Sequence, residues 1–167
     1  SPDLIVSFVT KEAGELSYLL EDMRKHDYSF TTPGCTGLNY TTDKGFEVIP
    51  LFKTDTVGCW NEIETTNFID DTVRMNPAKG ETEEIFTTAL ALRRDINNKE
   101  QRIIIIGDAD CLSNSEVEMR RKGIRAANYS FILGTFFWLS NEEVPIDIRR
   151  PTPPDNKVYV GESGMKV

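Results

Sequence analysis

The residues best placed to do chemistry are two aspartates that follow a run of four isoleucines. The run is Ile103–Ile106, and Asp108 and Asp110 come directly after Gly107. Two carboxylates at the end of a strand can divide the work of phosphoryl transfer, one as nucleophile and one as general acid. This spacing predicts a divalent-metal-dependent phosphohydrolase as one candidate function.

The sequence around the two aspartates departs from that chemistry. Haloacid-dehalogenase-type phosphatases carry Thr or Val where this chain has Leu112, and the remaining chain is too short to supply a convincing downstream pair of a Lys and an acidic residue. A metal-ion-dependent adhesion site would need Asp-x-Ser-x-Ser, which the chain also lacks. In the alternative interpretation Asp108 accepts backbone N–H bonds, and Asp110 or Ser113 caps a loop or helix. We therefore expect no catalytic residue, and we expect a ligand or partner surface at four positions: Asp108, Asp110, Ser113 and Asn114.

Other nucleophilic or metal chemistry has little support in the chain. Cys111 would need small neighbours and a histidine partner to act as an amidotransferase nucleophile, and the single histidine, His26, lies in a polar stretch. A carboxylate-only Ca²⁺ site remains open. The three cysteines include no CxxC pair, so we expect buried thiols, with a Cys35–Cys59 bridge as the alternative. No metal site or cofactor is predicted.

The isoleucine run also sets the expected fold. A continuous apolar run indicates a strand covered on both faces, so residues 102–107 are predicted to form a central buried strand flanked by helices. This is a layered α/β sheet of the flavodoxin- or amidotransferase-like kind. In such sheets ligands bind at the carboxyl ends of strands, which is why Asp108 and its neighbours stand out.

The rest of the chain is expected to supply elements around this strand. Hydrophobic spacing predicts helices at 11–26 and 128–139, the second one capped by Asn128. Pro50 lies within a predicted strand and indicates an edge or a bulge. The other expected strands cover four segments: 4–9, 46–52, 85–92 and 144–150.

Length and charge limit the function further. The chain has 167 residues, which suits a single domain over 1–150 with an extended tail over 151–167. A net charge of −8 argues against nucleic acid as a partner. No apolar stretch approaches the roughly 20 residues that span a bilayer. The chain begins without Met, and we expect it to be a piece of a longer protein.

Several motifs in register resemble one family. Residues Arg102–Asn114 resemble the "hydrophobic strand, Gly-Asp-Ser-Asp-Phe, Ser-Asn" signature of GldG-like, gliding-motility-type auxiliary subunits of ABC transporters. Residues 128–139 resemble the helix that follows this signature, and 142–150 resemble the closing strand. Gly45–Thr54, with Trp60-x-Glu62, is similar to an earlier motif. Ala109 and Cys111 replace the usual Ser and Phe.

This resemblance implies a place in a transport complex. Such domains lie between membrane spans on the extracytoplasmic (periplasmic) side of the cytoplasmic membrane, in a permease-like subunit that works with a separate ATPase. They are similar in fold to amidotransferases but lack the nucleophile and the histidine. The expected function is thus a non-catalytic binding or interaction domain of an ABC-2-type transporter membrane subunit. The sheet is expected to be incomplete, because the chain starts partway through the domain.

Overall fold

The computed structural model describes residues 4–63, 74–118 and 120–141. Five strands and three α-helices make up the described regular structure, together with short 3₁₀ turns. The helices are α1 (Ser17–His26), α2 (Asn114–Glu118) and α3 (Asn128–Leu139). The strands are β1 (Leu4–Val9), β2 (Phe30–Pro33), β3 (Glu47–Thr54), β4 (Thr87–Ile96) and β5 (Lys99–Ile106).

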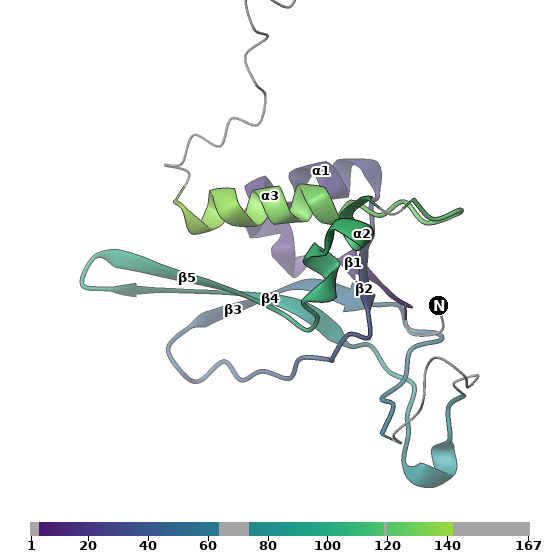
Figure 1. Cartoon of the computed structure of the whole chain (residues 1–167). Helices are drawn as coiled ribbons and strands as arrows, with labels where there is room; N and C mark the ends of the chain where they lie inside the picture. Colours follow the sequence, from purple (N-terminus) through teal and green to yellow (C-terminus); the bar gives the residue numbers. More distant parts are fainter. Residues whose placement is uncertain (1–3, 64–73, 119, 142–167) are drawn as a thin grey trace, which may run out of the picture.

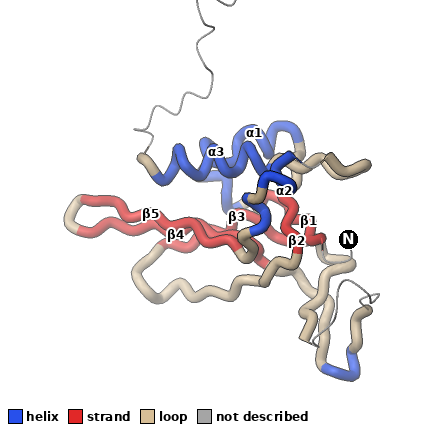
Figure 2. Tube along the Cα trace, in the orientation of Figure 1, coloured by secondary structure: helices blue, strands red, loops and turns tan. Residues whose placement is uncertain are grey.

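The strands form one antiparallel sheet in the order β2-β1-β3-β4-β5. The sheet curves into a half-barrel, and α1 and α3 lie side by side on one of its faces (Figures 1 and 2). The expected flavodoxin- or amidotransferase-like α/β layering is therefore wrong. Successive strands here are joined by antiparallel pairing, whereas that class needs parallel strands with helical crossovers on both faces.

The isoleucine run lies at the edge of this sheet, which corrects the prediction of a central buried strand over 102–107. Strand β5 pairs with β4 and is the last strand in the order. Ile104 and Ile106 pack against the core, whereas Ile103 and Ile105 are 41% and 39% exposed. Four apolar residues in a row indicate a strand, but they do not show that both of its faces are covered.

Three phenylalanines from distant segments form the centre of the core. The rings of Phe30 and Phe52 are stacked at 4.6 Å between centroids, and Phe131 meets both of them edge-on at 5.0 Å. All three side chains are fully buried. Leu20 and Met23 of α1 are buried in the same cluster. This contact joins α3, β2 and β3 into one hydrophobic core beneath the two helices.

Local sequence signals account for the shape of the sheet's long hairpin. Asn97 and Asn98 both have positive φ, 52° and 60°, as a two-residue turn between antiparallel strands requires.

Two local expectations from the sequence are met elsewhere in the fold. The pairing of β3 with β4 shifts register between Pro50 and Phe52, so the expected bulge at Pro50 is confirmed. The helix expected over 128–139 is confirmed as α3.

Two expected segments lie outside the described residues. These are the strand over 144–150 and the tail over 151–167. Among the residues that are described, no helix is long and apolar enough to cross a bilayer.

Candidate functional site

The predicted site residues lie on the segment that leaves β5 and turns back toward α3. Asp108 stands at the strand end, where its Oδ1 accepts a hydrogen bond from the backbone N–H of Asp110 at 2.9 Å. The thiol of Cys111 donates to the Asp108 carbonyl at 3.0 Å. Asp108 thus organises the turn through backbone contacts, which is the structural role predicted above as the alternative to catalysis.

Burial shapes the ionisation of this turn. The second carboxylate oxygen of Asp108, Oδ2, is buried without a hydrogen-bond partner among the described residues, and desolvation raises the pKa of this carboxyl. Desolvation also raises the pKa of the Cys111 thiol to about 12. Because the thiolate is the nucleophilic form, Cys111 is held in its unreactive state near neutral pH.

The other three predicted site residues, Asp110, Ser113 and Asn114, follow Asp108 along the same segment. Asp110 and Asn114 are exposed. Ser113 accepts the backbone N–H of Glu116 on its Oγ at 3.2 Å, as an N-capping serine does at the start of α2. Among the described residues no group of three or more Cys, His, Asp or Glu side chains is arranged to hold a metal ion.

A buried polar network lies directly behind this turn. Glu116 is buried, and its carboxylate accepts two hydrogen bonds from Arg121, at 2.6 and 2.7 Å. The hydroxyl of Thr31, on β2, donates to the same carboxylate at 2.5 Å. The Arg121 hydrogen bonds are the main reason that the pKa of Glu116 is lowered. The Thr31 hydrogen bond to this paired carboxylate ties the segment after β5 to β2, the opposite edge strand of the sheet.

Asn128 completes the network instead of capping α3. Its side-chain oxygen accepts the Thr31 N–H at 3.0 Å, and its side-chain nitrogen donates to the carbonyls of Thr31 and Cys111 at 2.7 and 3.1 Å. The residue at the N-cap position is Ala127, which makes no side-chain capping bond. The expected capping role of Asn128 is wrong because tertiary partners on β2 take up its amide.

Sequence reasoning missed the members of this network. Glu116 and Arg121 read as parts of a solvated charged stretch, since neither has an apolar pattern around it. Thr31 is 85 residues from Glu116 and 97 from Asn128. The one available signal was the group of charged residues that precedes the helix predicted over 128–139, and it does not specify which residues pair.

Gly107 allows the loop after β2 to lie against the end of β5. The Thr36 N–H donates to the Gly107 carbonyl at 3.0 Å, and a Cβ on Gly107 would lie 2.0 Å from the Thr36 carbonyl oxygen. We expect Gly107→Ala to lower the free energy of unfolding by about 1–3 kcal/mol, because backbone must move to admit the methyl group. Thermal denaturation measures the loss.

Gly14→Ala is the matched control for that substitution. A Cβ at Gly14 would meet only the end of the Arg24 side chain, at 3.3 Å, and that flexible group can shift. Equal stability losses in the two variants would show that the close approach at Gly107 is unimportant.

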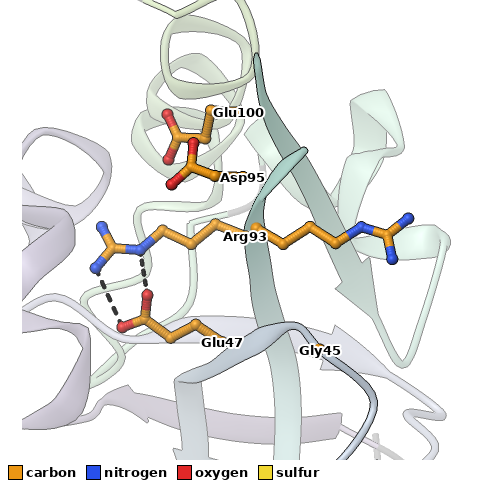
Figure 3. Close-up of a pocket in the computed structure, with 6 residues that line it drawn as sticks. Gly45, Glu47, Arg93, Asp95 and Glu100 are labelled. Carbon is orange, nitrogen blue, oxygen red and sulfur yellow. Dashed lines mark hydrogen bonds and ion pairs between the residues drawn. The ribbon is translucent and has the colours of Figure 1, made fainter. Parts of the chain in front are cut away.

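A concave region lies near the tip of the β4–β5 hairpin (Figure 3). Arg93 donates two hydrogen bonds to Glu47 across the β3–β4 pairing, one of them at 3.1 Å. Arg94 lies over the Phe46 ring, with its guanidinium carbon 4.1 Å from the centroid. Arg94 also donates a hydrogen bond to the side chain of Gln101 on β5 at 2.8 Å. The two arginines of this pocket thus link neighbouring strands, which gives them a structural role in the hairpin.

The comparisons with known proteins add no relative. No protein-family model matches the chain, and neither a curated protein nor a solved structure shows significant similarity to it.

Proposed function

We propose that this chain is a non-catalytic interaction domain of an ABC-2-type transporter membrane subunit. In this proposal the domain lies on the extracytoplasmic side of the cytoplasmic membrane, and the complex includes a separate ATPase. The order of the GldG-like motifs supports the transporter assignment. The fold implied by that resemblance does not support it, because the observed sheet is antiparallel.

The observation that carries the interaction role is a partly exposed group of apolar side chains on the sheet. We define the outer face as the side of β3–β5 that points away from α1 and α3. Register places Val48, Leu92 and Ile103 side by side on it, with Ile105 in the next row. Ile103 and Ile105 are about two-fifths exposed, and the other two are half-buried. Adjacent exposed apolar residues on a sheet are typical of contact surfaces between proteins.

The geometry at the end of β5 gives less support to the phosphohydrolase alternative. The rule that ligands gather at carboxyl ends of strands holds for open parallel sheets, and β5 is an antiparallel edge strand. In addition, one Asp108 oxygen is already engaged by the backbone of Asp110. We therefore assign a structural role to the turn after β5 and a binding role to the outer face.

A binding experiment with the transporter's membrane subunits tests the proposal. We expect the double substitution Ile103→Lys and Ile105→Lys to weaken association by about tenfold or more, since central apolar contacts dominate such interfaces. Both side chains are exposed enough to accept lysine without loss of the fold, which circular dichroism can verify. Val57→Lys is the control, because Val57 is 75% exposed and lies in the loop after β3. Unchanged binding by the double variant would rule out the outer face as the contact.

An activity assay separates the two candidate functions. We expect no hydrolysis of a generic phosphomonoester in the presence of Mg²⁺ above that of buffer. Turnover that disappears in Asp108→Asn would establish the enzyme and contradict the non-catalytic proposal.

A further inference from the structure

Two of the three cysteines lie on segments that meet at the end of β5. All three are free thiols in the structure, so the alternative Cys35–Cys59 bridge is not formed. Cys35 lies in the loop after β2, and Cys111 lies in the 3₁₀ turn Asp110–Leu112 after β5. Cys59 lies in the loop between β3 and β4, where its carbonyl accepts the Glu84 N–H at 3.2 Å. Cys35 and Cys111 are thus the pair that the fold brings to one place.

The sulfur atoms of this pair lie beside the same two consecutive residues, Gly107 and Asp108. A Cβ placed on Gly107 would lie 2.9 Å from the Sγ of Cys35. On the next residue, the Asp108 carbonyl oxygen accepts the thiol of Cys111 at 3.0 Å. The hydrogen bond from the Thr36 N–H to the Gly107 carbonyl, at 3.0 Å, holds the loop after β2 against this point. Because Gly107 has no side chain, the Cys35 sulfur can lie directly against the backbone that leads to Cys111.

The ionisation of the two thiols is also linked. Desolvation, the Asp108 carboxylate and the Cys35 thiolate raise the pKa of Cys111, in that order of importance. Desolvation is likewise the main reason that the pKa of Cys35 is raised, and the Asp108 carboxylate adds to it. Interactions between charges weaken with distance, so this mutual effect agrees with the proximity that the contacts indicate. A disulfide would replace two thiols whose charged forms are poorly solvated here.

We propose that Cys35 and Cys111 form a disulfide bond by exchange with an oxidised small disulfide. The Cys35 thiolate attacks one sulfur of that disulfide, whose other sulfur leaves as a thiolate, and a mixed disulfide results. The Cys111 sulfur then attacks Cys35 and displaces the second small thiol. The protons of the two protein thiols end on the two released small thiols. The chain is oxidised to a disulfide, and the small disulfide is reduced.

Burial sets the order of these two steps. Cys35 is half-buried and can meet an oxidant, whereas Cys111 is fully buried in the core. Cys111 is also held in place, because its carbonyl accepts the side-chain nitrogen of Asn128 at 3.1 Å. A disulfide requires the two Cα atoms to lie within about 7 Å of each other. Cys35 follows the turn at Gly34, where φ is 66°, and we expect this loop to make any adjustment.

The bond would fasten the loop after the edge strand β2 to the turn after the opposite edge strand β5. Cross-linking residues this far apart in the sequence restricts the unfolded chain, which stabilises the fold. The inference stands apart from the proposed function, although the extracytoplasmic side is a compartment in which disulfides persist. Oxidation is followed in the chain alone, so its failure is distinct from a failure of the outer face to bind.

Peptide mapping of the full chain tests the bond. The protein is incubated with oxidised glutathione at mildly alkaline pH, alkylated without reduction and analysed by mass spectrometry. We expect one cross-linked pair of peptides that joins Cys35 to Cys111, with Cys59 alkylated. A glutathione adduct that persists on Cys35 would overturn the proposal, because the Cys111 sulfur then cannot reach it. A Cys35–Cys59 bond, or alkylation of all three thiols, would overturn it as well.

Thermal denaturation of two serine variants provides the matched comparison. We expect the oxidised chain to melt about 5 °C or more above the reduced chain. Cys59→Ser should keep this difference, because Cys59 takes no part in the bond. Cys35→Ser should abolish it and leave Cys111 reduced. Equal differences in the two variants would contradict the proposed pairing.

Discussion

Phe131→Ala should lower the free energy of unfolding by about 3–5 kcal/mol. The Phe131 ring is fully buried and meets both Phe30 and Phe52 at 5.0 Å, so truncation leaves a cavity at the junction of α3, β2 and β3. These three elements are held by the same contact, and their backbone cannot collapse to fill the space without breaking the others. Urea denaturation monitored by circular dichroism measures the change.

Phe136→Ala is the matched control for the core variant. Phe136 lies on the same helix but is 56% exposed, so its truncation removes little buried area. We expect a change within about 0.5 kcal/mol, as for surface substitutions in general. Similar losses in the two variants would contradict the assignment of Phe131 to the centre of the core.

Two of the helices and the bulge at Pro50 were accessible from sequence because their signals are local. The long apolar segment at 128–139 forms α3 as expected, and spacing over 11–26 predicted the region that the structure divides into a 3₁₀ turn and α1. Pro50 predicted the bulge in β3, because proline lacks the backbone N–H that pairing with a neighbouring strand requires.

The sheet's topology was not accessible in the same way. Whether Ile103–Ile106 lies at the centre or the edge depends on which strands pair with it, and those partners are chosen by contacts far along the chain. The same β-branched run suits a parallel central strand and an antiparallel edge strand that leaves Ile103 and Ile105 exposed. The predicted fold class was wrong because an apolar run on both faces of a strand does not require that other elements pack against both faces.

The contacts of the candidate site show the same difference between local and long-range interactions. The bond from Asp108 to the Asp110 N–H spans two residues, and the bond from Ser113 to the Glu116 N–H spans three, so both roles could be foreseen from spacing. The contact of Thr31 with Glu116 spans 85 residues. No pattern within either segment specifies its partner, and only the folded chain identifies this network.

That network supports the other large expected effect. Arg121→Met should destabilise the protein by about 3 kcal/mol at neutral pH, because it leaves the Glu116 carboxylate buried without its cation. Among the described residues, the Thr31 hydroxyl alone would still donate to that carboxylate. Substitution of both partners, as Glu116→Gln with Arg121→Met, should recover part of the loss, since no buried charge then remains. Urea denaturation at pH 7 provides the comparison.

The pH dependence of the stability of Arg121→Met tests whether loss of the ion pair causes the destabilisation. Arg121 holds the pKa of Glu116 below its ordinary value of 4.5, so in the wild-type protein this pair stabilises the fold fully above that value. Its contribution is lost as pH falls through the lowered folded-state pKa, where the carboxylate takes up a proton. The stability gap between Arg121→Met and wild type should therefore narrow on acidification. A gap that stays constant from pH 7 to acid pH, or an equal loss in the exposed neighbour Lys122→Met, would show that packing rather than charge explains the effect.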